Sequence, residues 1–127
     1  RGFDDNYFAP HSRYTEVLLS DVQARKELIA LSVSDIAGLH IAAERGGRRI
    51  FVTGHAEYDR DTLAKEYFRD VNKGLDPAVP YNYFPEDDPA RTPPFTWRSN
   101  AHLLVSNWLN YYVYQQTPYD FVGETPV

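Results

Sequence analysis

Two short apolar runs separated by a pair of glycines constrain the fold of this chain more than any other feature. The runs cover residues 39–43 and 49–53, and Gly46 and Gly47 lie between them. Glycine adopts the positive φ angles of tight turns at no steric cost, so the pattern predicts a β-hairpin. Residues 50–52 are Ile-Phe-Val, without polar alternation. We therefore expect both faces of this second strand to be covered.

Further elements are predicted on either side of this hairpin. Residues 28–34 (Leu-Ile-Ala-Leu-Ser-Val-Ser) are typical of a strand. A short helix over residues 21–27 is expected to begin at Ser20, whose hydroxyl can accept a hydrogen bond from a free backbone N–H.

The second half of the chain favours two more helices. After Asp59 and Asp61, apolar residues recur at helical spacing until Lys73 and Gly74 mark a helix end; they are Leu63, Ala64, Tyr67, Phe68 and Val71. Residues 77–98 are rich in proline, and we expect an ordered but irregular excursion there. Ser99 or Asn100 is expected to cap a last helix that runs to about Gln116 and is stopped by Pro118. Its apolar face would comprise Leu104, Trp108, Leu109 and Tyr112.

Composition limits the class of protein. A chain of 127 residues forms one domain. A mean hydropathy of -0.54, with no apolar run near the length of a membrane span, indicates no membrane partner. The net charge of -5, with mixed signs along the chain, argues against nucleic-acid binding. The beginning of the chain shows no secretion signal, so we expect a cytoplasmic protein, and since it lacks an initiator Met we expect a piece of a longer one.

The segment after the second hairpin strand carries the clearest chemical signal. His55 and Glu57 follow Gly54, where the predicted strand ends. In open α/β sheets, ligands gather at the carboxyl ends of strands. A histidine there can act as a general base, and a nearby carboxylate can hold its tautomer and stabilise the imidazolium. The pattern alone fits a structural pair equally well. No spacing of His, Asp and Glu indicates a metal site, and the chain contains no cysteine.

Several longer blocks resemble the homoserine O-succinyltransferase family of homoserine O-acyltransferases. They extend over essentially the whole chain and are weakest across residues 17–48. The matching blocks are residues 1–5, 9–14, 53–59, 66–70, 74–77, 79–85, 97–99, 107–115 and 117–120.

This resemblance implies a fold like that of class I glutamine amidotransferases, a flavodoxin-like α/β sheet with helices on both faces. Family members are roughly twice this length or more, and their catalytic cysteine lies upstream of the segment that matches Arg1. The chain is thus similar to the C-terminal portion of a single acyltransferase domain. The family commonly has His-Pro-Glu where this chain has Ala56, which removes a φ restraint but no functional group.

The resemblance also implies a reaction in methionine biosynthesis. A cysteine thiolate takes a succinyl or acetyl group from acyl-CoA, and the hydroxyl of L-homoserine then attacks the thioester. His55 would act as base and Glu57 would hold it, with Ser12 and Arg69 binding substrate. No cofactor is implied beyond acyl-CoA as substrate, and the full-length enzyme is expected to be a homodimer. This chain alone is expected to be inactive, because it lacks the cysteine.

Helical periodicity and the resemblance disagree about Arg69. Its guanidinium suits the carboxylate of homoserine, yet it points away from the apolar stripe and is expected in solvent unless that face borders the substrate. The Ser12 hydroxyl could instead satisfy a loop backbone after Pro10. His11 could line the site, whereas His40 and His102 are expected to be structural or exposed.

Two other functions fit parts of the sequence. One is an amidotransferase-like hydrolase, disfavoured because the matches continue through the proline-rich excursion and the last helix. The other is a non-catalytic binding or assembly domain, which is supported by the absence of cysteine from this chain. Because parallel sheets bury both faces, the isolated piece is expected to be poorly soluble or to persist in association with the remainder.

Overall fold

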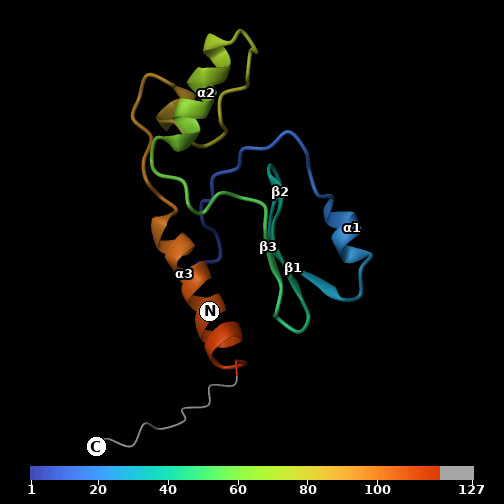
Figure 1. Ribbon diagram of the computed structural model, residues 1–127. Helices are drawn as coiled ribbons and strands as arrows, with labels where there is room; N and C mark the ends of the chain where they lie inside the picture. The colour runs from blue at the N-terminus through green and yellow to red at the C-terminus, as the bar shows by residue number, and fades with distance from the viewer. Residues whose placement is uncertain (118–127) are drawn as a thin grey trace, which may run out of the picture.

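Three antiparallel strands in the order β1-β2-β3 form the sheet of this small α/β structure (Figure 1). The computed structural model describes residues 1–117 of the chain. The strands are β1 (Leu28–Ser34), β2 (Gly38–Glu44) and β3 (Ile50–Val52). The helices are α1 (Leu19–Gln23), α2 (Thr62–Asn72), the 3₁₀ turn η1 (Pro85–Asp87), α3 (Arg98–Trp108) and the π-helical turn η2 (Leu109–Tyr114).

The predicted strands and the hairpin are confirmed. Ile41 of β2 faces Val52 of β3, and the hairpin turn contains Gly47 with a φ of 72°. A Cβ atom at Gly47 would clash with the ring of Tyr112. Gly47 is therefore required both for its backbone conformation and for the close approach of the last helical turn. Gly46 does not have a positive φ, so only one of the two glycines supplies it.

The expectation that both faces of β3 are covered is wrong. Phe51 is 46% exposed and Val52 is 39% exposed. The buried strand is β2, which lies in the centre of the sheet. Its residues Leu39, Ile41 and Ala42 are nearly inaccessible to solvent. Since β3 pairs on one side only, its apolar side chains gain less cover than those of β2.

The described strands also depart from the parallel arrangement that the flavodoxin-like resemblance implied. Residues 35–37 and 45–49 alone connect the three strands. Parallel neighbours need a crossover of a dozen or more residues, so connections this short permit only antiparallel pairing.

Both of the predicted helix caps are wrong. Ser20 lies inside α1, which begins after Leu18 and ends at Gln23, and the carbonyl of Leu18 accepts the N–H of Asp21 at 3.1 Å. Similarly, α3 begins one residue before Ser99, and no side-chain cap bond is present. Backbone carbonyls thus accept hydrogen bonds from the N–H groups of the first helical turns, where serine or asparagine side chains were expected to accept them. Helical structure continues through η2 to Tyr114, and the predicted stop at Pro118 lies outside the described residues.

Helix α2 forms where the apolar spacing predicted it, between Asp61 and Lys73, with Gly74 at a φ of 72° directly after it. Leu63 and Ala64 are buried, but Phe68 and Val71 remain about 40% exposed further along the helix. The stripe is therefore packed only at its N-terminal end.

Two hydrophobic clusters hold the elements. One joins α1 to the sheet through Val22, Leu39 and Ala42. The other joins α2 to the proline-rich residues 77–97 and consists of Leu63, Ala64, Tyr83, Phe84 and Trp97. Burying an aromatic side chain of this size stabilises a fold by about 2–3 kcal/mol, so residues 77–97 are anchored although they contain no regular element longer than η1.

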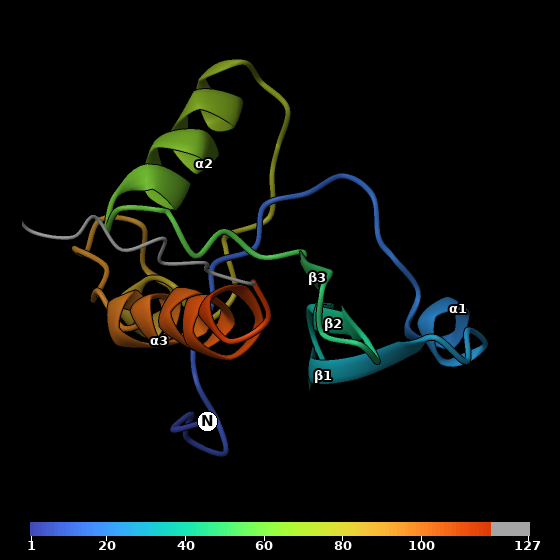
Figure 2. The same ribbon diagram turned by 60° about the horizontal axis from the view of Figure 1, so that its bottom comes forward.

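Figures 1 and 2 show α1 and α3 on opposite sides of the sheet, with α2 beyond the end of β3. The loop from β3 to α2 runs beside the N-terminal segment in both views. Within residues 1–117, no helix has the length and apolar character needed to cross a membrane.

Candidate active site

The loop after β3 is fixed to the N-terminal segment by backbone hydrogen bonds. The N–H of His55 donates to the carbonyl of Pro10 at 2.8 Å, and the N–H of Thr53 donates to the carbonyl of His40 at 2.9 Å. Residues 10–13 and 53–58 therefore lie side by side, although more than forty residues separate them. This places Ser12 next to His55.

His55 and Glu57 are in direct contact. Nδ1 of His55 lies 2.8 Å from Oε1 of Glu57, and the imidazole is 34% exposed. Partial burial raises the pKa of Glu57, but the hydrogen bond from His55, a backbone hydrogen bond and the charge of His55 outweigh it, so the net pKa is lowered. The carboxylate is thus ionised and oriented on the imidazole at neutral pH.

The other ring nitrogen faces an acceptor as well. Nε2 of His55 lies 3.3 Å from the backbone carbonyl oxygen of Ser12. A neutral imidazole has one N–H, whereas the imidazolium has two. Only the protonated ring can donate to Glu57 and to Ser12 together.

Tyr58 lies flat against the imidazole. The ring centroids of His55 and Tyr58 are 4.3 Å apart with an interplanar angle of 18°. The Tyr58 hydroxyl donates to Oε1 of Glu66 at 2.9 Å. Burial and the neighbouring Glu66 carboxylate raise the pKa of Tyr58, while a hydrogen bond from the Ser12 side chain acts in the opposite direction. Ser12 contacts the site directly through its carbonyl, which faces Nε2 of His55.

Glu66 is a site residue that the sequence reasoning missed. It lies on α2, and its second carboxylate oxygen, Oε2, is buried with no hydrogen-bond partner among residues 1–117. A buried acceptor without a donor is costly, which makes this oxygen a candidate partner for a donor group, although Glu66 does not line the cleft described below. The signal in the sequence was its position one helical turn before Arg69, on the polar side of α2.

Arg69 is half exposed and its guanidinium is engaged by its neighbour. Nε and Nη2 donate to the two oxygens of Asp70 at 2.8 and 3.1 Å, and the Tyr14 hydroxyl reaches the same carboxylate at 3.4 Å. The hydrogen bond from Arg69 lowers the pKa of Asp70. The structure thus places Arg69 away from the apolar stripe, on the α2 face that carries Glu66, and shows no direct contact between Arg69 and His55.

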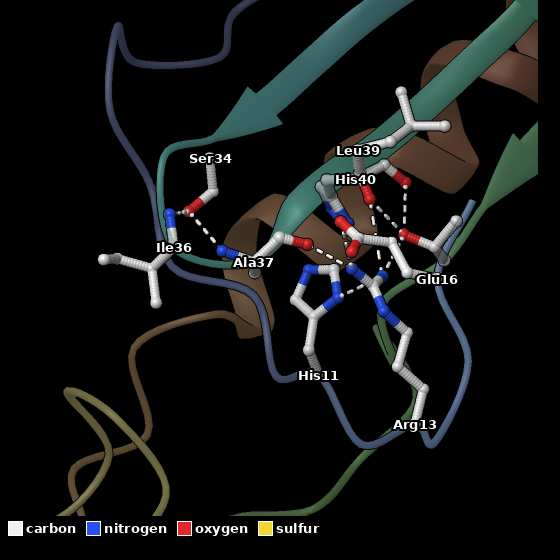
Figure 3. A network of polar contacts seen from close by, with 9 residues as sticks. His11, Arg13, Glu16, Ser34, Ile36, Ala37, Leu39 and His40 are labelled. Carbon is white, nitrogen blue, oxygen red and sulfur yellow. Dashed lines mark hydrogen bonds and ion pairs between the residues drawn. The ribbon is translucent and has the colours of Figure 1, made fainter. Parts of the chain in front are cut away.

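Arg13 was not singled out from the sequence, yet it joins more polar groups than any predicted site residue (Figure 3). Nη1 donates to Nδ1 of His11 at 3.1 Å and to Oγ1 of Thr53 at 3.0 Å, and Nη2 donates to the carbonyl of Ala37. These partners come from the N-terminal segment, from the loop after β3 and from the β1–β2 turn. Arg13 thereby holds together the segments that carry Ser12 and His55.

Two further histidines lie behind His55. His40 of β2 is 5% exposed, and its Nδ1 has no partner among the described residues. Burial, followed by the charges of His11 and Arg13, lowers the pKa of His40 to about 4. Burial also lowers the pKa of His11, with smaller effects from Arg13 and His55. His40 is therefore a neutral structural residue, as expected, and His11 borders the site.

The solvent side of the site is an open cleft of about 690 Å³. His55 and Glu57 lie on one wall, and Arg98 and His102 of α3 line the opposite one. The Arg98 guanidinium lies 4.2 Å from the centre of the Phe95 ring. The cleft is large enough for a small substrate beside the imidazole. Within residues 1–117, no cluster of three or more His, Asp or Glu side chains is arranged to hold a metal ion.

Comparison with known proteins matches nearly the whole chain to a family of enzymes. The model of the family "Homoserine O-succinyltransferase" matches residues 1–119. The chain is 62% identical over 120 residues to the homoserine O-acetyltransferase of Brevibacillus brevis, 58% identical to that of Acetivibrio thermocellus and 54% identical to that of Petrotoga mobilis. These alignments cover 94% of this chain and 39% of each relative, so the chain spans about two fifths of the length of the curated relatives it matches.

Proposed function

The chain belongs to the homoserine O-succinyltransferase family, and from this premise we propose that it contributes the base and its carboxylate partner to an enzyme that acylates L-homoserine. The observation that carries the proposal is the contact between His55 and Glu57 at 2.8 Å, with Ser12 on the other edge of the ring. The acyl donor is an acyl-CoA, and the product is the O-acyl ester of homoserine.

The chemistry requires a nucleophile that this chain does not contain, since it has no cysteine. In the proposed reaction, a thiolate from the remainder of the longer protein attacks the acyl-CoA carbonyl, the carbon–sulfur bond to CoA breaks, and CoA leaves as the thiol with a proton from His55. The homoserine oxygen then attacks the enzyme thioester, its proton passes to His55, and the thiolate is released. Dividing the transfer into two covalent steps lowers the barrier of each.

His55 is arranged to act through Nε2. Nδ1 is held by Glu57, so Nε2 is the nitrogen that can exchange protons with thiol and hydroxyl groups. When Nε2 carries the proton, the Ser12 carbonyl 3.3 Å away can accept its N–H. Glu57 and Ser12 together stabilise the imidazolium that forms in each half of the reaction.

Homoserine carries an ammonium and a carboxylate, and α2 presents a group for each. Arg69 can form a forked pair with the carboxylate, in exchange for part of its contact with Asp70. Glu66 has a free, buried carboxylate oxygen to receive the ammonium. Ser12 would direct its hydroxyl toward the substrate from the N-terminal segment.

The proposal also covers the acyl group that is transferred and the enzyme to which this chain belongs. The relatives are named for acetyl transfer and the family for succinyl transfer, so we include both acyl groups. We propose further that the chain is the C-terminal portion of a flavodoxin-like acyltransferase domain, that it acts in the cytoplasm without a cofactor as part of methionine biosynthesis, and that the whole enzyme is a homodimer.

The test uses the full-length protein that contains this chain. We expect His55→Ala to abolish homoserine-dependent CoA release from acetyl-CoA or succinyl-CoA. Loss of a general base lowers rates by about 100- to 10,000-fold. Arg49→Ala, which changes a side chain that is 73% exposed and lies outside the cleft, serves as the control and should retain activity. Near wild-type turnover in His55→Ala would refute the assigned role.

One alternative has an observation in its favour. Because the chain has no cysteine, it could serve as a non-catalytic binding or assembly module. An assay of acyl transfer by the full-length protein distinguishes the acyltransferase from the non-catalytic module. A module of that kind would bind a partner without any transfer of acyl groups to homoserine, whichever acyl-CoA is offered.

A further inference from the structure

We propose that Tyr58 is a positioning residue for His55, which stabilises the imidazolium from the face of the ring while Glu57 acts at its edge. This inference rests on the proposed function, because it assigns His55 the role of base. It adds a support that neither the motif around His55 nor the family match indicates by itself.

The stacked geometry is the first step. With centroids 4.3 Å apart and planes within 18°, the phenol ring covers one face of the imidazole. Glu57 and the Ser12 carbonyl contact the ring only at its two nitrogens, and contacts at these two points leave the ring free to tilt about the line that joins them. Contact over the whole face restricts this rotation. Edge and face contacts together therefore define the direction in which Nε2 points.

Tyr58 can give this support because it is itself held at three points. Its hydroxyl donates to Glu66 at 2.9 Å, and its carbonyl accepts the indole N–H of Trp97 at 2.9 Å. Its own N–H donates to the carbonyl of His55 at 3.2 Å. Trp97 is 4% exposed and belongs to the cluster that joins α2 to residues 77–97. The phenol is thereby connected to the hydrophobic core beneath the site.

The stack can also contribute electrostatically while His55 carries the proton that it takes up in the proposed reaction. The π-face of an aromatic ring attracts a cation, so the stack strengthens when the imidazole is protonated. Donation of the phenol proton toward the Glu66 carboxylate increases the electron density of the ring and strengthens this attraction. The carboxylate of Glu57 contacts His55 directly, His11 lies nearby on the N-terminal segment, and Arg98 and His102 line the same cleft. The Tyr58 face would therefore act together with Glu57 on a protonated ring.

The experiment compares Tyr58→Leu with Tyr58→Phe in the full-length protein. Both variants lose the hydroxyl bond to Glu66, and they differ in whether an aromatic ring remains against His55. We expect kcat for acyl transfer to fall about 10-fold in Tyr58→Leu relative to Tyr58→Phe, while KM for homoserine is equal in the two. A purely structural role would change protein yield or melting temperature and leave this kcat difference absent.

A spectroscopic measurement tests the geometry without activity. In the protein labelled at histidine carbons, the ring current of a stacked phenol shifts the carbon-bound ring protons of His55 upfield. The His55 signal is assigned by its loss in His55→Ala. We expect its upfield position to persist in Tyr58→Phe and to be lost in Tyr58→Leu.

The outcomes separate this inference from the proposed function. Equal kcat in the two Tyr58 variants, or an unchanged His55 signal in Tyr58→Leu, would overturn the positioning role even in an active acyltransferase. Absence of acyl transfer in the wild-type protein would overturn the proposed function, and the histidine spectrum would still decide whether the stack exists.

Discussion

His40 and Gly54 share a small space directly behind His55. A Cβ atom on Gly54 would lie 2.8 Å from two ring atoms of His40 and 3.0 Å from the Pro10 carbonyl. Glycine is therefore required before the predicted base, because any side chain would displace either His40 or the N-terminal segment. A neutral ring fits this space, since a buried imidazolium would need an acceptor that Nδ1 lacks among the described residues.

The buried His40 makes stability dependent on pH. Its pKa is about 4 in the folded protein and 6.5 in the unfolded chain, so the unfolded state binds more protons between these values. The contribution is fully present above pH 6.5 and is lost as the pH falls toward 4, by about 3 kcal/mol in total. Urea unfolding of the full-length protein should show this decline. His40→Gln, which cannot be protonated, should flatten it, and an equally steep decline in that variant would contradict the assignment.

Arg69 offers a prediction about substrate use. Replacing its forked guanidinium by the single ammonium of Arg69→Lys should raise KM for homoserine by about 10- to 100-fold, because one charge-assisted hydrogen bond of a bidentate pair is lost. KM for acyl-CoA should stay near its wild-type value. Steady-state kinetics with each substrate varied in turn measure both constants. An equal effect on the two substrates would count against carboxylate binding by Arg69.

At the scale of elements, the site depends on contacts between segments that carry no regular structure. Residues 10–13 and 53–58 are loops, and the β1–β2 turn is only three residues long. Arg13 lies among them with its guanidinium hydrogen-bonded to all three segments, and its side chain is 22% exposed. A single planar group thus adds to the backbone hydrogen bond between His55 and Pro10 in aligning these segments.

We therefore expect Arg13→Lys to affect stability and activity together. Lysine keeps the charge but cannot form several fixed hydrogen bonds at once, so the free energy of unfolding should fall by roughly 2 kcal/mol. Misplacement of Ser12 and His55 should lower kcat/KM by about 10-fold. Thermal unfolding and CoA release measure the two effects. Arg49→Lys is the matched control, because Arg49 is 73% exposed and forms one ion pair with Glu44; equal losses in both variants would contradict the role of Arg13.

At the scale of the whole molecule, much apolar surface remains uncovered. On β1 and the turn after it, Leu31, Val33 and Ile36 are each more than half exposed. A cavity of about 710 Å³ lies between this face of the sheet and α3, with Trp108 and Tyr112 on its far side. Exposed apolar patches of this kind are uncommon on monomers and mark surfaces that pack against another body. The chain spans 39% of the length of its relatives.

This surface predicts the behaviour of the isolated chain. We expect residues 1–127 expressed alone to bind a hydrophobic dye, to associate during gel filtration and to unfold without a sharp transition. The same segment within the full-length protein should bind far less dye, and the comparison of the two is the measurement. A monomeric 127-residue chain with a sharply cooperative melt would contradict the expectation.

The sequence by itself determined the features that depend on neighbouring residues. Turn chemistry at Gly47 predicted the hairpin, strand-forming composition predicted β1, and the spacing of Leu63 and Tyr67 predicted α2. The proximity of His55 to Glu57 follows from a separation of two residues. The helix caps failed because a hydroxyl near a helix start is only one of several acceptors, and backbone carbonyls served instead.

Only the tertiary structure decided how far the side chains of β3 are exposed and which residues surround the imidazole. Tyr58 follows His55 by three residues in sequence, but its support comes from Glu66 and from Trp97, which is 39 residues from Tyr58. Arg13 reaches Thr53 across 40 residues. Such contacts arise from the packing of distant segments, and no local periodicity encodes them. The motif therefore indicated where the chemistry lies, and the fold determined which side chains hold the histidine in place.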